Sequence, residues 1–191
     1  MIKKLGIILL SIMMIGALAG CSAFADKSGA VKADIASCED LLNQVWDTFE
    51  EDEKFAAYGG DFAHLADGKA GAFDMSDEEA LVYTLLIPQE SIGLVDEAAS
   101  LIHMMNANTF TSAAFHLKDT AQTQELVDAL KNNIMNTQWM CGFPDTLNIF
   151  VVNGEYVVSA FGNAEIMENF KTKLVEVFGD SAVVTVEESL I

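Results

Sequence analysis

Apolar residues recur every three to four positions near the start of the chain, which is the spacing of one face of an α-helix. The stripe begins just after Ser37 and consists of Cys38, Leu41, Leu42, Val45, Trp46 and Phe49. Acidic residues fall largely between these positions, so the pattern predicts a helix whose apolar stripe packs against a core. From Lys54 to Phe73 the pattern is broken by several glycines, which predicts loops or a weakly helical stretch.

Two further helices are predicted before position 106. Ser76 is followed three residues later by Glu79, the spacing of a capping box, and a helix is expected from there to just before Pro88. Helical spacing returns over 94–105. One side of that helix would carry Leu94, Ala98, Leu101, Ile102 and Met105.

After Asn106 the period changes, and strands alternate with helices to the end of the chain. A helix is predicted after Asp119, and another between Asn163, its N-cap, and Gly179, its C-terminal stop. Asn153-Gly154 is a strong signal for a hairpin turn, since both residues tolerate positive φ. The predicted strands are 109–117, 147–152, 156–161 and 182–186.

The predicted order of elements over residues 108–187, βαββαβ, is that of a ferredoxin-like sandwich. Right-handed crossovers would place its first and third strands in the middle of an antiparallel sheet. Both faces of the two hairpin strands are mostly apolar, so both faces of the sheet should be covered. We expect the two helices of this part to cover one face, and the N-terminal helices, or a partner protein, to cover the other. The chain is thus predicted to form a single α+β domain at 35–191, with 35–105 helical.

The first 20 residues have the pattern of a secretory leader. Lys3 and Lys4 precede an apolar run of about 14 residues, shorter than the roughly 20 that span a bilayer. The sequence Leu18-Ala19-Gly20-Cys21 resembles the bacterial lipobox, in which the cysteine is diacylated and the leader is removed just before it. We therefore predict a lipoprotein signal peptide at 1–20, a lipid on Cys21, a flexible tether at 21–34 and a location on the extracytoplasmic side of the cell membrane. The alternatives are an ordinary signal peptide with a chance cysteine and an uncleaved anchor.

Charge narrows the choice of partners. The formal net charge is -19 at pH 7, and removal of a leader with two lysines and no acidic residue brings it to -21. Phosphate binding needs lysine and arginine, so nucleic acid is excluded as a partner. Contact of the domain with anionic lipid is also disfavoured, which leaves the lipid on Cys21 as the link to the membrane. Solubility accounts for the acidity, and attraction of cations or of a basic partner is the alternative.

Two cysteines, Cys38 and Cys141, are left for structure once Cys21 is assigned to the lipid. Neither has a second cysteine at CxxC spacing, and no histidine lies close to either in the sequence. Two buried free thiols are favoured over a disulfide between them, and the pairing stays open at this stage.

The stretch richest in metal-ligating residue types contains His64 with Asp61 and Asp67. Their spacing fits neither a calcium loop nor the H-E-x-x-H zinc motif, so no metal site is predicted. His116 is expected to be partly buried and hydrogen-bonded on a strand, and His103 to lie at the rim of the helix over 94–105.

The sequence contains no pattern for an activated nucleophile and no glycine-rich loop that opens a helix. We therefore predict no cofactor and no enzymatic activity. An acid-dependent hydrolase that uses carboxylates of the segment 59–74 is kept as an alternative, because acidic residues are abundant there.

The apolar and aromatic run between 138 and 145 is a candidate interaction loop. Its residues are Trp139, Met140, Phe143 and Pro144. If it is exposed, it would contact a partner, and if it packs against the end of the sheet, it is a lid on the core. The lid is the favoured interpretation.

Short motifs between about Glu78 and Phe178 form a recognisable series. They are Glu79, Tyr83 and Pro88, then Lys118-Asp119, Pro144-Asp145 and Asn153-Gly154-Glu155-Tyr156-Val157, ahead of a closing amphipathic helix. With the leader, this series resembles a family of small lipoproteins from Gram-positive, largely anaerobic bacteria, whose shared domain has no assigned function. The resemblance implies a lipid-anchored protein and carries no known catalytic residues.

These observations predict a lipid-anchored extracytoplasmic protein with a non-enzymatic binding or accessory role at the outer face of the membrane, toward an unidentified protein partner or ligand. The alternative is a lipoprotein that binds a small molecule or peptide for a transporter, which a large apolar pocket between the helical part and the sheet would favour. The oligomeric state does not follow from the sequence.

Overall fold

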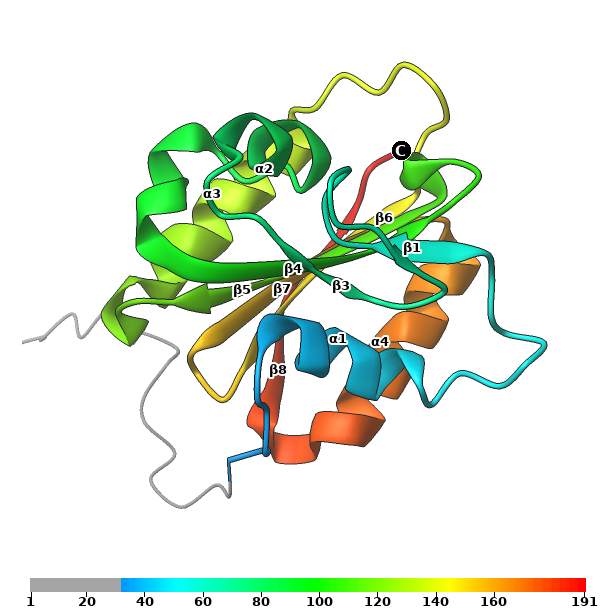
Figure 1. The fold of residues 1–191 in the computed structure, drawn as a ribbon, viewed down its shortest axis with the longest axis horizontal. Coiled ribbons are helices and arrows are strands. Elements are labelled where there is room, and N and C mark those ends of the chain that lie inside the picture. The colour runs from blue at the N-terminus through cyan, green and yellow to red at the C-terminus, as the bar shows by residue number, and fades with distance from the viewer. Residues whose placement is uncertain (1–31) are drawn as a thin grey trace, which may run out of the picture.

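The computed structural model describes residues 32–191, so the leader and the predicted lipid attachment at Cys21 lie outside the described residues. Figure 1 shows a central sheet with helices on both of its faces. The helices and strands, in chain order, are α1 (Cys38–Trp46), β1 (Ala57–Gly59), β2 (Ala66–Asp67), β3 (Gly71–Phe73), α2 (Glu78–Thr84), β4 (Val95–His103), β5 (Phe110–Leu117), α3 (Thr123–Met135), β6 (Thr146–Val152), β7 (Tyr156–Gly162), α4 (Ala164–Phe178) and β8 (Ala182–Ser189).

The sheet has eight antiparallel strands in the part of the chain that the structure describes. Its order is β2-β1-β4-β5-β7-β6-β8, and β3 pairs with β4 beside β1. Strands β6 and β7 form the predicted hairpin, in which Asn153 and Gly154 have φ of 55° and 76°. The α+β class is therefore confirmed.

The segment predicted as a third helix is instead the strand β4, so that prediction is wrong. Residues 98–102 are buried in succession, because β4 pairs on both sides and both faces of the sheet are covered. A strand buried on both faces shows no alternation, and the period of a short apolar run does not distinguish it from a helix. Its alanines, which are strong helix formers, added to the error. The glycine-rich stretch before it also contains three short strands, β1 to β3, rather than loop alone.

The strand order departs from that of a ferredoxin-like sandwich. In that arrangement the last strand pairs with the first, here β5, whereas β8 pairs with β6. The cause is β4, which pairs with β5 along its length and occupies the edge that β8 would need. Strands β5 and β7 do lie next to each other inside the sheet, as predicted.

The two long helices of the second half cover opposite faces of the sheet. α3 links β5 to β6 and α4 links β7 to β8, and both connections cross one intervening strand in the same direction along the sheet. Because β5 and β7 are antiparallel, right-handed crossovers put these helices on opposite faces. Leu126 and Leu130 of α3 belong to one core, and Phe170 and Leu174 of α4 to the other. The expectation that both helices share a face is therefore wrong: α1 covers the face of α4, and α2 that of α3 (Figure 1).

Side chains cap the N-termini of both α1 and α2, but the cap of α2 is not the serine that the sequence suggested. Ser37, the residue after which the helical stripe begins, caps α1, and its Oγ accepts a hydrogen bond from the Asp40 amide at 3.0 Å. α2 is capped by Asp77, whose carboxylate accepts a hydrogen bond from the Ala80 amide at 3.0 Å. Ser76 does not cap it, because its hydroxyl donates to Asp74 at 2.7 Å instead. A carboxylate one position later thus replaces the predicted hydroxyl.

The described chain begins at the hairpin end of the sheet. The Ala33 amide donates to Asn153 Oδ1, and Asn153 Nδ2 donates to the Ala33 carbonyl, both at 2.9 Å. Lys32 forms an ion pair with Glu155 at 3.0 Å. The last residues of the predicted tether are therefore fixed against the turn between β6 and β7. Within residues 32–191 no helix has the length and apolar character needed to cross a membrane.

Candidate functional site

The segment 60–66, which we call the Asp61 loop, folds around a buried carboxylate. Asp61 is 4% exposed. It accepts hydrogen bonds from the amides of Ala63 and His64 (2.8 Å each), from the Asp74 amide (3.0 Å) and from His64 Nδ1 (3.0 Å). Gly60, with φ of 78°, lets the chain turn into the loop. These contacts fix the path of the Asp61 loop on the edge of the sheet.

The same hydrogen bonds set the charge of Asp61. Burial raises the pKa of this carboxyl, but the donors from Asp74, His64 and Ala63 outweigh burial and hold its pKa below the ordinary value. The pKa of Asp74 is also lowered, chiefly because the backbone and side chain of Ser76 donate to it. Both carboxyls are therefore ionised at neutral pH. A general acid needs a carboxyl that keeps its proton near the working pH, so this pair does not support the hydrolase alternative.

His64 lies against Asp61, as their proximity in sequence suggested, but Asp67 does not join them. Asp67 lies on β2, directly opposite Tyr58 of β1. Among residues 32–191 no three His, Cys, Asp or Glu side chains converge in a way that would hold a metal ion. Asp61 and His64 therefore act as the scaffold of a loop.

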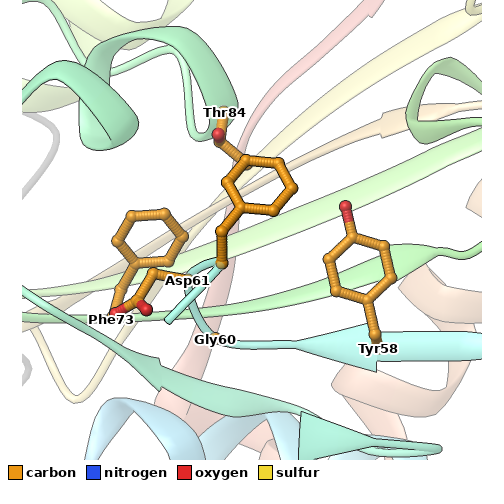
Figure 2. Close-up of a pocket in the computed structure, with 6 residues that line it drawn as sticks. Tyr58, Gly60, Asp61, Phe73 and Thr84 are labelled. Atoms are coloured by element: carbon orange, nitrogen blue, oxygen red, sulfur yellow. The ribbon is translucent and has the colours of Figure 1, made fainter. Parts of the chain in front are cut away.

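A shallow hollow lies between the Asp61 loop, β1, β3 and α2. Figure 2 shows Tyr58 on one side of it, Phe73 on the other and Thr84 of α2 above. The remaining lining residues are Gly60, Asp61 and Phe62. The hollow is open to solvent and encloses no space for a water molecule, so it is a shallow surface depression and not a pocket for a small ligand, which spans roughly 300–1,000 Å³. Burial also raises the pKa of the Tyr58 hydroxyl, which keeps that group neutral.

Large apolar side chains are exposed around the hollow. Phe62 is 78% exposed and Leu65 is 58% exposed, both on the Asp61 loop, and Tyr83 of α2 is 76% exposed. A loop tied down by a buried carboxylate does not need exposed aromatic side chains for its own stability. Grouped exposed apolar residues on a soluble domain mark an interaction site. We call Tyr58, Phe62, Leu65, Phe73, Tyr83 and Thr84 the aromatic surface.

The predicted interaction loop, residues 139–144, is packed against the sheet at its ends and exposed in its middle. Trp139 packs on Phe161 at a ring separation of 5.1 Å, and Pro144 is buried. The middle is open, with Met140 88% and Phe143 67% exposed. The two ends therefore cover the core as a lid, and the middle is open to solvent and could contact a partner. We call this segment the Met140 loop.

Two asparagines hold the Met140 loop against the turn before β5. Asn106 Nδ2 donates to the Cys141 carbonyl at 3.0 Å, and Asn108 Nδ2 donates to the carbonyls of Cys141 and Gly142 at 2.9 and 3.0 Å. Gly142 has φ of 91°. The path of this loop thus depends on exposed amide side chains, where the Asp61 loop depends on a buried carboxylate.

The two cysteines do not pair. Cys38 is buried at the start of α1, and its Sγ lies 3.7 Å from the Glu97 carbonyl. Burial, followed by the charges of Glu97 and Asp96, raises the pKa of Cys38 far above the ordinary value, so the group is an inert thiol. Cys141 is exposed, so the expectation of two buried thiols is wrong for that residue. The reason is that only the ends of the Met140 loop pack against the sheet.

The remaining histidines have structural partners. His116 is partly exposed on β5, and its Nδ1 lies 2.6 Å from Asp96 Oδ1, as expected of a hydrogen-bonded strand histidine. His103 lies on β4 rather than on a helix, stacks on Phe55 at 4.9 Å, and accepts a hydrogen bond from the Met105 amide. Burial lowers the pKa of His103, which favours the neutral ring that this bond requires.

The aromatic surface was not found from the sequence. Its members come from β1, a loop, β3 and α2, and no spacing links them along the chain. One local signal was present: Phe62 and Leu65 are large apolar residues in a polar, glycine-rich stretch with no amphipathic period to bury them.

No protein-family model, curated protein or solved structure matches this chain. The resemblance to the lipoprotein family therefore stays a prediction from its motifs. The site is interpreted from its contacts, exposure and charge.

Proposed function

We propose that this protein is a lipid-anchored extracytoplasmic binding protein, held at the outer face of the membrane through Cys21 and acting by contact with a partner. It would be a member of the lipoprotein family that its motifs resemble. Catalysis is not part of the proposal, since the carboxylates near the hollow serve as hydrogen-bond acceptors within the fold.

The observation that supports a binding role is the aromatic surface. Phe62, on a loop whose backbone is fixed, and Tyr83, on α2 next to Thr84 of the hollow, both stand open to solvent. Aromatic anchors are typical of the centres of protein interfaces. A lipoprotein that hands a small molecule to a transporter would need a larger enclosed pocket, so the hollow favours a macromolecular partner.

The point where the described chain begins supports the proposed orientation. Lys32 and Ala33 contact the hairpin turn that follows β6, whereas the Met140 loop immediately precedes β6. Seven strand residues separate these ends by about 23 Å, and a flexible tether of ten residues would have a typical reach of about 18 Å. The hairpin end would thus face the membrane, and the exposed Met140 and Phe143 would face away from it.

Anchoring is tested with the full chain in a Gram-positive host, as wild type and as Cys21→Ser. We expect the intact mass of the wild type to show loss of residues 1–20 and addition of a diacylglycerol group, with the protein in the membrane fraction. The Cys21→Ser chain should leave that fraction. A membrane-bound Cys21→Ser chain, or a wild-type mass without lipid, would contradict the proposal.

Binding is tested in the same cells with a photoreactive phenylalanine analogue at position 62 and, as a matched control, at Glu125. Glu125 is exposed on α3 and does not line the hollow. The proposal expects a discrete cross-linked species from position 62 alone. Equal labelling from both positions, or none, argues against a binding role for the aromatic surface.

A further inference from the structure

Exposed acidic residues are neighbours of the residues that form the aromatic surface. Asp67 is paired with Tyr58 across β1 and β2, so both side chains lie on one face of the sheet. Asp74 follows Phe73 directly and donates its amide to Asp61, which lines the hollow. On α2, Glu79 and Tyr83 are one turn apart and both are exposed.

Few cations balance these groups. The segment 57–84 contains six acidic residues and a single lysine. That lysine, Lys69, lies 3.7 Å from Glu39 of α1. His64 is engaged with Asp61. The surface around the hollow therefore carries a net negative charge with exposed aromatic rings in it.

We propose that the aromatic surface binds a positively charged segment of a partner protein, with apolar side chains of that segment against the exposed rings of Phe62 and Tyr83 and its lysines or arginines against Asp67, Asp74 and Glu79. The inference rests on the proposed binding function and specifies the chemistry of the partner. Exposed rings also favour cations, because the face of an aromatic ring attracts an ammonium or guanidinium group.

Other occupants fit less well. An anionic lipid surface would be repelled by the same carboxylates. A second copy of the chain would bring together two acidic surfaces, since each copy carries a formal charge of -19 with its leader. The test below includes a result that would identify each of these two occupants.

The test uses the Cys21→Ser chain and two synthetic twelve-residue peptides, one of alternating lysine and leucine and one of alternating glutamate and leucine. Binding is followed by calorimetry and by NMR shifts. We expect the lysine peptide alone to bind, with the largest shifts at Tyr58, Phe62 and Tyr83 and with affinity that falls as salt is added.

Matched variants separate this surface from general attraction to an acidic protein. Phe62→Ala should weaken binding about tenfold, the effect of losing an aromatic anchor, whereas Phe143→Ala, at a similarly exposed phenylalanine, should leave the affinity within about twofold. Asp67→Asn should weaken binding more than Glu125→Gln on α3.

Several results would overturn the inference: no binding of the lysine peptide, equal binding of the glutamate peptide, or equal effects of the two phenylalanine variants. Binding of the unacylated chain to phosphatidylglycerol vesicles through Phe62 would assign the surface to lipid. A dimer in sedimentation that Phe62→Ala abolishes would assign it to a second copy. Anchoring is measured separately by the mass of the wild-type chain, so a failure of the inference leaves that part of the proposed function standing.

Discussion

The Asp61 loop and the Met140 loop each expose a phenylalanine, but they are held in different ways. In the first, a carboxylate that is 4% exposed accepts four hydrogen bonds from within the loop and from Asp74. In the second, exposed amides of Asn106 and Asn108 donate to two carbonyls. Buried charge-assisted bonds are stronger than exposed neutral ones. The Asp61 loop is thus the more rigid support for a binding surface.

Asp61→Ala should have the largest effect. It leaves three amides and one imidazole nitrogen without the buried carboxylate that holds the loop together, which we expect to cost about 3 kcal/mol of unfolding free energy. Urea denaturation measures the cost. Asp67→Ala, at an exposed carboxylate nearby, is the control and should change stability by less than about 0.5 kcal/mol. Equal effects of both changes would show that burial of Asp61 is not what holds the loop.

A glycine in each loop allows a direct comparison. A Cβ at Gly60 would lie 2.3 Å from the His64 carbonyl oxygen, part of the backbone, whereas a Cβ at Gly142 would lie 2.7 Å from Asn106 Nδ2, the end of a side chain. Both residues have positive φ. We expect Gly60→Ala to cost about 2–3 kcal/mol and Gly142→Ala about 1 kcal/mol, since only Asn106 can rotate away. Thermal unfolding of the two variants in parallel checks the order, and the reverse order would contradict the comparison.

The difference between the loops also explains what the sequence predicted and what it did not. Local signals were sufficient where the determinant is local: Asn153-Gly154 forms the hairpin turn, and α4 ends at Gly179. β4 was mistaken for a helix because burial on both faces removed its alternation. That error then misplaced β8, whose partner depends on which edge of the sheet is free.

The candidate site was predicted only in pieces. The Met140 loop is continuous in sequence, so its apolar run was visible, although its division into packed ends and an open middle was not. The aromatic surface is assembled from β1, β3, α2 and a loop by pairing with the misassigned β4. Without that strand no sequence pattern brings Tyr58, Phe73 and Thr84 together.

Acid should weaken the Asp61 loop selectively. The pKa of Asp61 in the folded chain lies below its value of about 3.9 in an unfolded chain. Its stabilising contribution is therefore complete above about pH 4 and is lost as the pH falls through the folded value. We expect the stability difference between the wild type and Asp61→Asn, measured in urea from pH 7 to pH 3, to narrow below pH 4. A constant difference over that range would show that the ionised carboxyl is not the form that matters.

The smallest effect is a difference in thiol reactivity, which compares the open middle of the Met140 loop with the core. In the Cys21→Ser chain at pH 8 we expect a disulfide reagent to label Cys141 at once and Cys38 only on unfolding, because Cys141 is exposed while burial raises the pKa of the Cys38 thiol.

The raised pKa of Cys38 also makes the stability of the folded chain depend on pH. The unfolded chain loses this proton at a lower pH than the folded chain, so stability should fall as the pH rises above about 8.5. Cys38→Ala, which removes the thiol, should reduce that fall, while Cys141→Ala should leave it unchanged. Rapid labelling of both thiols in the folded chain would mean that α1 opens readily from the sheet. The core that α1 and α4 form with the sheet would then be less stable than its packing indicates.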